Sequence, residues 1–292
     1  MTGAGPIDKL RDYALLMRLD RPIGIWLLLW PTLWALWFAA DGPPDLHVLV
    51  VFVLGTVLMR SAGCAINDFA DREFDPHVAR TRQRPVAAGR VAPSEALRLF
   101  VVVSLVAFGL LSSLKNTLAL ALSVPAALLA ALYPFCKRWI SMPQAVLGIA
   151  FSWGIPMAYA AVRHEIVWIE VAALMLANLC WVVAYDTYYA MADREDDLKI
   201  GVKSSAILFG RHDRRVIAGL QTLALLLLAA LGLADGRGPA FFAGLLVAAG
   251  LALRQWRMTR SRESAACFAA FLDNNRFGLA VFVGLAVDHW LR

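Results

Sequence analysis

The sequence predicts an all-α, polytopic membrane protein, and three features of its 292 residues support this fold class. First, 60% of the residues are hydrophobic and only 17% are charged, far from the balance of an average soluble domain. Second, apolar runs that approach the thickness of a bilayer recur along the whole chain. Third, Lys and Arg gather in alternate loops between these runs, as expected for loops on the cytoplasmic side of a membrane.

About nine apolar runs are expected to be transmembrane helices, and the merging of weak runs would reduce this number to eight. Several runs are shorter than the roughly 20 residues that a perpendicular helix needs, so their polar ends should extend the helices. No linker or appended soluble segment interrupts the series, so residues 1–292 are expected to form one domain. The runs are residues 23–40, 46–65, 97–111, 118–133, 145–162, 166–184, 216–234, 240–253 and 277–287.

Two acidic segments interrupt this apolar chain, and carboxylates are among the side chains that a bilayer tolerates least. The first segment, 67–75, follows the second apolar run, and the second segment, 186–197, follows the sixth. This echo suggests two four-helix halves that face a shared cavity, with the ninth helix as an addition. In each segment three aspartates share one helical face, provided that the second helix continues past the membrane surface. They are Asp68, Asp71 and Asp75 in the first segment and Asp186, Asp193 and Asp197 in the second.

Two facing aspartate stripes suit Mg²⁺ bound to a phosphorylated substrate. Mg²⁺ takes hard oxygen ligands and is usually shared between a few carboxylates and phosphate oxygens. We therefore expect all six aspartates to be metal ligands, and four of them, Asp71, Asp75, Asp193 and Asp197, to be essential for catalysis. The alternative is a solvated cytoplasmic face, but such a face needs no helical register and would not recur.

Cationic side chains near the acidic segments can complement the phosphate oxygens that metal ions leave free. A diphosphate is thus the expected ligand. For most of these cations taken singly, an anchor at the cytoplasmic membrane surface is the alternative. The cations are Arg72 within the first segment and Arg80, Arg82, Arg84 and Arg90 after it, Lys199 and Lys203 after the second, and Lys137 and Arg138 between the fourth and fifth runs. Of these we expect Arg72, Lys137, Arg138, Lys199 and Lys203 to bind substrate.

The distribution of basic residues predicts the orientation of the chain. All but four of the 28 Lys and Arg residues lie in the N-terminal stretch and in the loops of one side. The positive-inside rule places that side, with the N-terminus and both acidic segments, in the cytoplasm. The net charge of +6 is therefore mostly topological, and we expect no nucleic-acid partner. The four exceptions are Lys115, Arg163, Arg237 and Arg292.

Several stretches resemble the UbiA superfamily of membrane prenyltransferases. NDFADREFDPHVARTRQRPVAAGRV looks like the NDxxDxxxD signature of that superfamily, and YDTYYAMADREDDLKIGVKSSAILFG looks like its second, DxxxD-bearing signature. Within the superfamily the second signature is most similar to the 4-hydroxybenzoate polyprenyltransferases of ubiquinone synthesis. Supporting matches are MRLDRPIGIWLLLWPTLWALW, YPFCKRW and CFAAFLDNNRFGLAVFVGL, so the resemblance covers nearly the whole chain.

The resemblance implies an all-helical bundle around a central cavity that opens to membrane lipid, in a bacterial inner membrane. It implies transfer of a polyprenyl group from polyprenyl diphosphate to the ring carbon ortho to the hydroxyl of 4-hydroxybenzoate, with Mg²⁺ as cofactor and diphosphate released. By motif position it supports five of the six aspartates as ligands, with Asn67 beside them at the substrate, and it supports Asp186, Lys137 and Arg138 less directly.

Two further residues are expected to contact the substrates. Ionisation of an allylic diphosphate leaves a carbocation, which aromatic faces stabilise once water is excluded. Tyr189 is expected to serve here, with Tyr185, Tyr188, Trp153 and Phe69 as other candidates; packing is the alternative for each. Arg60 interrupts an apolar run seven residues before Asn67, hence on roughly the same face, and is expected to anchor the carboxylate of the acceptor. Its alternative role is an ion pair with an acidic residue of the site.

Two other functions are compatible with the sequence. The first is an enzyme of the same superfamily with another acceptor, such as a different quinone precursor, haem or a lipid alcohol. The second is a transporter that couples ions through the carboxylates, although aspartates beside many cations suit a diphosphate better. A polar set near the last run is expected to cap helices or to line the cavity; it comprises Asp273, Asn274, Asn275 and Arg276.

Overall fold

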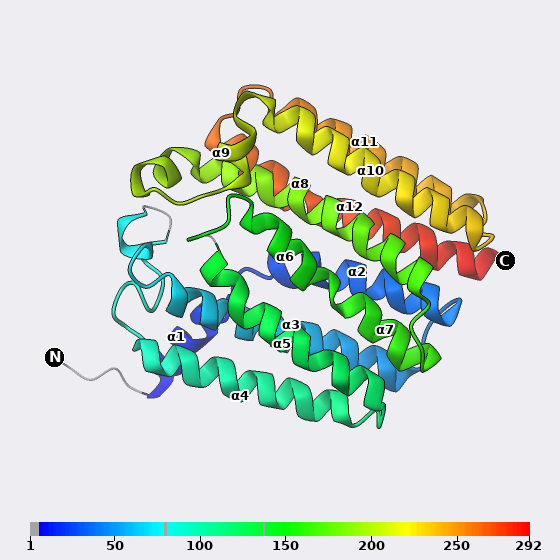
Figure 1. The fold of residues 1–292 in the computed structure, drawn as a ribbon, viewed down its shortest axis with the longest axis horizontal. Helices are drawn as coiled ribbons and strands as arrows, with labels where there is room; N and C mark the ends of the chain where they lie inside the picture. Colours follow the sequence, from blue (N-terminus) through cyan, green and yellow to red (C-terminus); the bar gives the residue numbers. More distant parts are fainter. Residues whose placement is uncertain (1–5, 79–80, 137) are drawn as a thin grey trace.

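A computed structural model describes residues 6–78, 81–136 and 138–292, and the regular elements in these ranges are all helices. The long helices lie side by side in one bundle (Figure 1). Within the described residues, nine helical segments are long and apolar enough to cross a membrane. The predicted fold class is confirmed, and the chain is an integral membrane protein.

Fourteen helical elements make up the described chain. In order they are α1 (Pro6–Leu16), α2 (Ile23–Ala40), α3 (Leu46–Ala70), η1 (Asp75–His77), α4 (Pro93–Ser112), α5 (Thr117–Cys136), α6 (Pro143–Ser152), α7 (Gly154–Arg163), α8 (Trp168–Ile200), α9 (Ser205–Phe209), η2 (Gly210–His212), α10 (Asp213–Ala234), α11 (Pro239–Met258) and α12 (Ser264–Leu291). Elements α6 and α7 together form one candidate span, and α9, η2 and α10 form another.

The fifth apolar run is broken into α6 and α7 at Trp153, whereas the sequence predicted one continuous span over 145–162. Pro156 explains the break, because proline lacks the N–H that would bond to the carbonyl of Ser152 in a continuous helix. Gly154 follows the break and lies close to α2, where an added Cβ would come within 3.0 Å of Thr32 Oγ1. The break therefore lets α7 pack closely against α2.

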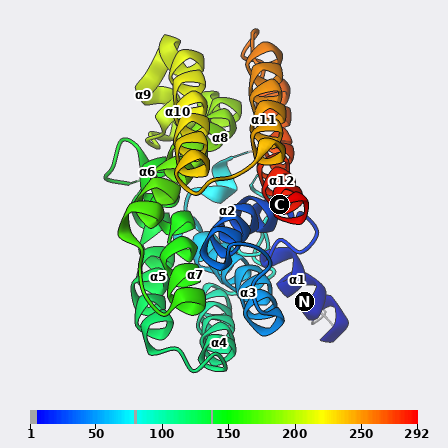
Figure 2. The same cartoon turned by 90° about the vertical axis from the view of Figure 1, so that its right-hand side faces the viewer.

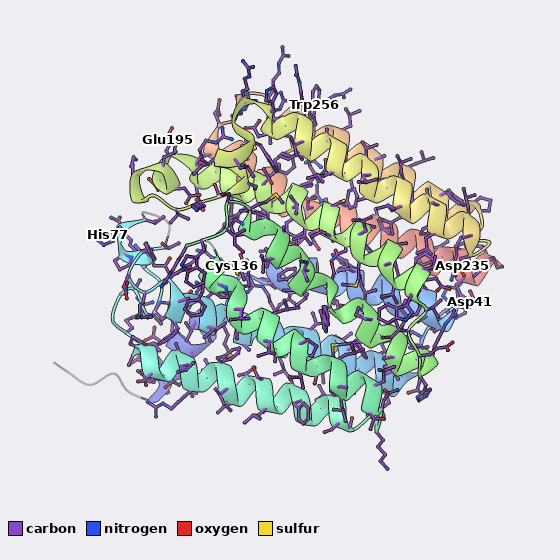
Figure 3. The ribbon with its side chains drawn as sticks, in the orientation of Figure 1. Asp41, His77, Cys136, Glu195, Asp235 and Trp256 are labelled. Atoms are coloured by element: carbon purple, nitrogen blue, oxygen red, sulfur yellow. The ribbon has the colours of Figure 1, made fainter. Side chains whose placement is uncertain are left out.

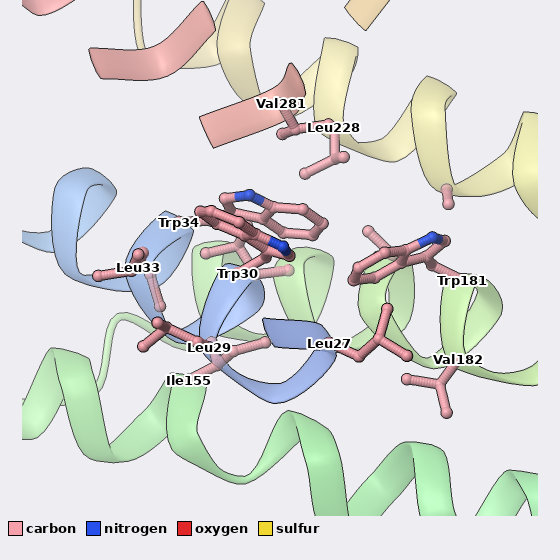
Figure 4. Packing of buried hydrophobic residues seen from close by; sticks show 14 of the residues in the cluster. Leu27, Leu29, Trp30, Leu33, Trp34, Ile155, Trp181, Val182, Leu228 and Val281 are labelled. Atoms are coloured by element: carbon pink, nitrogen blue, oxygen red, sulfur yellow. The ribbon is translucent and has the colours of Figure 1, made fainter. Parts of the chain in front are cut away.

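An aromatic core joins α2, α8 and α12. The rings of Trp34 and Trp181 lie 5.3 Å apart, and Phe277 stacks on Trp181 at 5.4 Å. Figure 4 shows Trp30, Trp34 and Trp181 gathered among aliphatic side chains of this core. In the end view of Figure 2, α2 lies in the interior of the bundle. Large aromatic surfaces contribute much of the burial in such cores, so these three helices should form a rigid support for the site.

The polar set near the last run neither caps a helix nor lines the cavity, so that expectation was wrong. Helix α12 begins at Ser264, well before the predicted 277–287, and the set lies inside it. Asn274 accepts a hydrogen bond from Trp181 Nε1 at 2.9 Å, and Asn275 accepts one from Trp30 Nε1 at 2.8 Å. Asn274 and Asn275 thus connect α12 to α8 and α2.

The two ends of the bundle carry different loops. The chain around His77 and Glu195, which includes both acidic segments, lies at one end, whereas Asp41 and Asp235 lie at the other (Figure 3). Figure 1 shows the α3–α4, α5–α6, α8–α9 and α11–α12 connections together at the first end. These are the connections that hold most of the basic residues, so the alternation of charge along the sequence corresponds to two distinct faces of the bundle.

Candidate active site

A cavity of about 1020 Å³ occupies the bundle and is lined by residues of α1 to α8 and of α12. Part of its wall is apolar, with small side chains from α4 and α5 such as Ala107, Ala126 and Ala130. Its polar lining includes all six predicted aspartates: Asp68, Asp71, Asp75, Asp186, Asp193 and Asp197. The structure thus brings both acidic segments to one cavity, which is suited to an amphiphilic ligand with a charged head and an apolar tail.

The first acidic segment reaches this cavity by a turn rather than by a longer helix. Helix α3 ends at Ala70, before Asp71 and Asp75, so the condition for a shared helical face of the three aspartates is not met. The N–H groups of Phe74 and Asp75 both donate to the carbonyl of Asp71, at 2.8 and 2.9 Å, and this turn folds the chain back. The aspartates remain buried, with exposed fractions of 1%, 4% and 5% for Asp68, Asp71 and Asp75.

Two arginines neutralise the first segment, and the sequence did not single out either of them. Arg84 Nη1 lies 2.9 Å from Asp75 Oδ2 and 3.4 Å from Asp68 Oδ1. Arg18, in the turn after α1, donates from Nη2 to Asp68 Oδ1 at 2.8 Å. Both arginines line the cavity. Arg84 was one of five arginines within or after the first segment, and spacing alone cannot show which of them the turn brings inward.

Burial and the nearby Arg84 shift the pKa of the Asp75 carboxyl in opposite directions. Burial raises the pKa of the Asp75 carboxyl above its ordinary value, although Arg84 opposes this shift. Burial lowers the pKa of the Arg84 guanidinium, but Asp68 and Asp75 outweigh that effect and the pKa is raised overall. Further cations beside these buried carboxylates would stabilise their charged form. Within the described residues, Asp68 Oδ2 is buried and has no hydrogen-bond partner, which suits an oxygen ligand for a cation.

The second acidic segment lies on one uninterrupted helix. Helix α8 continues to Ile200 and ends where Gly201 adopts the left-handed conformation, with φ of +70°. Asp186, Asp193 and Asp197 therefore do form one stripe, and each lines the cavity. Lys203 follows the helix and also lines the cavity, with its Nζ donating to the carbonyl of Trp139 at 3.1 Å.

The two segments together have the chemistry of a shared metal site rather than a closed one. Among the described residues, no three side chains of His, Cys, Asp or Glu are grouped closely enough to hold a metal ion alone. Carboxylates on two elements of one cavity, with cations beside them, instead fit metal ions that a phosphate group completes. The residues present therefore fit Mg²⁺ bound together with a phosphorylated ligand.

The other predicted substrate contacts divide into two groups. Asn67, Arg138, Lys203, Arg60 and Tyr189 line the cavity. The structure does not bring Arg72 or Lys199 to it. Arg72 bonds the Phe69 carbonyl and pairs with Glu73, and Lys199 is exposed beside Asp196. Lys137 lies outside the described residues. The side chains of these two cations point away from the cavity. The sequence alone does not show toward which side of its segment each cation points.

Three of the five aromatic candidates reach the cavity, namely Tyr185, Tyr189 and Trp153. Tyr188 is fully buried away from it, and Phe69 packs against the guanidinium of Arg72. The ring of Tyr189 is held against Phe271, with centroids 4.8 Å apart. Its orientation in the cavity wall is thus fixed by packing.

Arg60 projects into the cavity from the membrane-spanning part of α3. Its guanidinium lies directly against Gly24 of α2, where a Cβ atom would overlap it, and Nη1 donates to Cys64 Sγ. In the part of the chain that the structure describes, the buried Nε has no hydrogen-bond partner. Because the side chain of Arg60 lines the cavity, its positive charge is placed where it can attract an anionic group of a ligand.

Comparison with known proteins relates nearly the whole chain to one family. Residues 28–282 match the model of the UbiA prenyltransferase family. A 4-hydroxybenzoate octaprenyltransferase of Aeromonas salmonicida (strain A449) is 56% identical, over 96% of this chain and 96% of the relative. A protein of the same name from Azoarcus sp. (strain BH72) is 57% identical, over 97% of this chain and 98% of the relative.

Solved structures show the same fold. The apo structure of a UbiA homolog from Aeropyrum pernix K1 has a TM-score of 0.79 and 25% identity, covering 91% of this chain and 97% of that one. A UbiA homolog from Archaeoglobus fulgidus, bound to GPP and Mg²⁺, has a TM-score of 0.67 and 17% identity, covering 93% of this chain and 99% of that one. With the family model matched over most of its length, the chain belongs to the UbiA prenyltransferase family.

Proposed function

We propose that this chain transfers a polyprenyl group from polyprenyl diphosphate to the ring carbon ortho to the hydroxyl of 4-hydroxybenzoate, with release of diphosphate, in ubiquinone biosynthesis. The observation that carries this proposal is one cavity in which six aspartates and several cations meet an apolar wall. The relatives named 4-hydroxybenzoate octaprenyltransferase, 56% and 57% identical over nearly the full length, support the same acceptor here.

Mg²⁺ is the proposed metal, with the six cavity aspartates as its ligands. When bound, it supplies positive charge that neutralises the oxygens of the departing diphosphate. The Archaeoglobus fulgidus homolog, whose structure contains GPP and Mg²⁺, supports this choice. Asp71 and Asp75 in the first segment, and Asp193 and Asp197 in the second, are the ligands on which catalysis should depend most.

Neighbouring residues hold the carboxylates and receive the diphosphate. Asn67 Nδ2 donates to Asp71 Oδ2 at 3.1 Å and so orients that carboxylate. Arg138 Nη2 donates to the carbonyl of Ala70 at 2.6 Å and fixes the end of α3, while its charge remains at the cavity wall. Lys203 is a second cation at that wall. These cations should bind the oxygens that the metal ions leave free.

The apolar walls of the cavity protect the carbocation that forms when the diphosphate departs. Water would quench this cation, and burial between helices excludes water. The fixed ring of Tyr189 presents a π-face that stabilises positive charge. Arg60, whose side chain lines the cavity, should bind the carboxylate of 4-hydroxybenzoate. Attack by the ring carbon and loss of its proton then restore aromaticity.

An acceptor panel tests this function. Purified protein with a radiolabelled polyprenyl diphosphate and Mg²⁺ should label 4-hydroxybenzoate, and the product mass should equal the acceptor plus the prenyl group minus one hydrogen. A different quinone precursor, haem and a lipid alcohol serve as competing acceptors. Preferential labelling of any of these would replace the proposed acceptor, and no labelling of any acceptor would favour ion transport.

We further propose a bacterial inner-membrane location with the N-terminus and the acidic segments in the cytoplasm, because the connections at that end carry most of the basic residues. In a variant without native Cys, a cysteine placed in residues 76–92 or 195–210 should be protected from impermeant thiol reagents in intact cells. A cysteine near Gly42, at the opposite end, should be labelled. The reverse labelling pattern would overturn the orientation.

A further inference from the structure

A buried carboxylate outside the cavity holds together the segments around the second acidic segment. Asp213, the first residue of α10, has an exposed fraction of 0% and does not line the cavity. It accepts hydrogen bonds from Arg262 Nη2 at 2.9 Å, from Arg194 Nη2 at 2.6 Å and from the backbone N–H of Arg214 at 2.6 Å. Three donors on one buried carboxylate form a well-satisfied ionic cluster.

Arg194 connects this cluster to the proposed metal ligands. It directly follows Asp193 on α8, yet its guanidinium is turned away from the cavity and also donates to the carbonyl of Ala206 at 2.7 Å. Asp193 lines the cavity and Arg194, the next residue, bonds Asp213, so the two neighbours face different surroundings about one quarter of a turn apart on α8. The bond to Asp213 therefore fixes the rotation of this part of the helix.

The cluster also encloses the loop that follows α8. Residues 201–204 line the cavity and include Lys203. Arg194 precedes this loop, and Ala206 and Asp213 follow it. The bonds from Arg194 to both residues therefore connect the two ends of the loop. Arg262, between α11 and α12, closes the cluster by donating to the carbonyl of Arg211 at 3.0 Å. Figure 1 shows the end of α8, α9 and the start of α10 together at this end of the bundle.

We propose that Asp213 is a positioning residue that keeps the second acidic segment available to metal, an inference that rests on the proposed role of Asp193 and Asp197. It acts in two ways. It fixes the rotation of α8, and it retains the guanidinium of Arg194 outside the cavity. On a helix, residues three apart are neighbours, so a released Arg194 can reach Asp197 and compete with the metal ion for that carboxylate.

Direct metal binding tests the proposal, with Mn²⁺ as an EPR-detectable probe for the full chain in detergent. Asp213→Asn keeps the size of the side chain and removes its charge. It should weaken Mn²⁺ binding about tenfold or more, as expected when a carboxylate ligand is lost to a competing charged hydrogen bond. The apparent KM for 4-hydroxybenzoate should stay within about twofold, because its proposed site at Arg60 is separate. Adding Arg194→Gln to this variant should restore part of the Mn²⁺ affinity, since the competing guanidinium is then gone.

Asp288→Asn is the matched control, at the opposite end of the bundle. Asp288 is equally buried and accepts hydrogen bonds from the N–H groups of Gly238 and Phe241 at 2.9 and 3.4 Å. Its substitution should lower the thermal unfolding midpoint without changing Mn²⁺ affinity. Unchanged Mn²⁺ binding in Asp213→Asn, or equal weakening in Asp288→Asn, would overturn the proposal.

Two further variants keep the test decisive. If Asp213→Asn does not fold, Arg194→Gln alone breaks the same connection from the side of α8, and wild-type Mn²⁺ affinity in that variant would refute the positioning role. Asp193→Asn serves as the reference for the metal site itself. If it leaves Mn²⁺ binding unchanged, the proposed metal ligands are wrong, which is a different failure from that of Asp213.

Discussion

Replacing Asp71, Asp75, Asp193 or Asp197 by Asn should lower turnover by roughly 10²-fold to 10³-fold or more, because each change weakens the charge that stabilises the departing diphosphate. Asn retains the size of the side chain, so the fold should persist. Turnover of the purified variants is measured at saturating polyprenyl diphosphate and 4-hydroxybenzoate. The wild-type enzyme should be inactive in EDTA and should recover when Mg²⁺ is added.

Glu195→Gln is the matched control for these four variants. Glu195 belongs to the same acidic stretch of α8, but it is exposed and does not line the cavity. Its turnover should remain close to that of the wild type. Near-normal turnover in any two of the four aspartate variants would contradict their proposed role as metal ligands, as would an equal loss in Glu195→Gln.

Arg60→Leu should raise the apparent KM for 4-hydroxybenzoate about tenfold or more, as expected for the loss of a charged hydrogen bond of about 1.5 to 3 kcal/mol. The apparent KM for the polyprenyl diphosphate should stay nearly constant. The folded protein should survive, since the change removes a charge that is costly to hold within a membrane. Steady-state kinetics with each substrate varied in turn measures both values.

Gly24→Ala provides a second test of the same guanidinium. A Cβ atom at this position would overlap Arg60 Nε, so the substitution should displace the guanidinium and raise the same KM without removing its charge. If Arg60→Leu leaves the acceptor KM unchanged, or impairs both substrates equally, Arg60 instead has a structural role or acts on the metal site.

The sequence predicted the helices best where hydrophobicity alone determines them. The runs that became α2, α3 and α8 were predicted because apolar length and helical register are local properties. The second aspartate stripe was correct for the same reason, because α8 has no Gly or Pro to end it before Gly201. The first stripe reached the cavity for a different reason, since a turn after Ala70 replaced the expected helix.

The roles of polar side chains depended on tertiary contacts that no local pattern contains. Arg72 lies within the first segment and Arg84 follows it, yet only Arg84 lines the cavity and pairs with Asp75 and Asp68. Asn274 was interpreted as a cap or cavity residue, but its partner is Trp181, distant in sequence. The identity of such partners follows from the packing of whole helices. The sequence therefore predicted which types of residue form the site, but not which residues contact one another.

The central claim is that both acidic segments together hold a metal-bound prenyl diphosphate in one cavity. Anomalous diffraction from crystals soaked with Mn²⁺ and a non-reactive thiolodiphosphate analogue of the prenyl substrate tests it most directly. Anomalous peaks should lie between the diphosphate and the carboxylates of both segments, with Asp71 or Asp75 on one side and Asp193 or Asp197 on the other. Peaks outside the cavity, or a diphosphate bound without metal ions at these carboxylates, would contradict the claim.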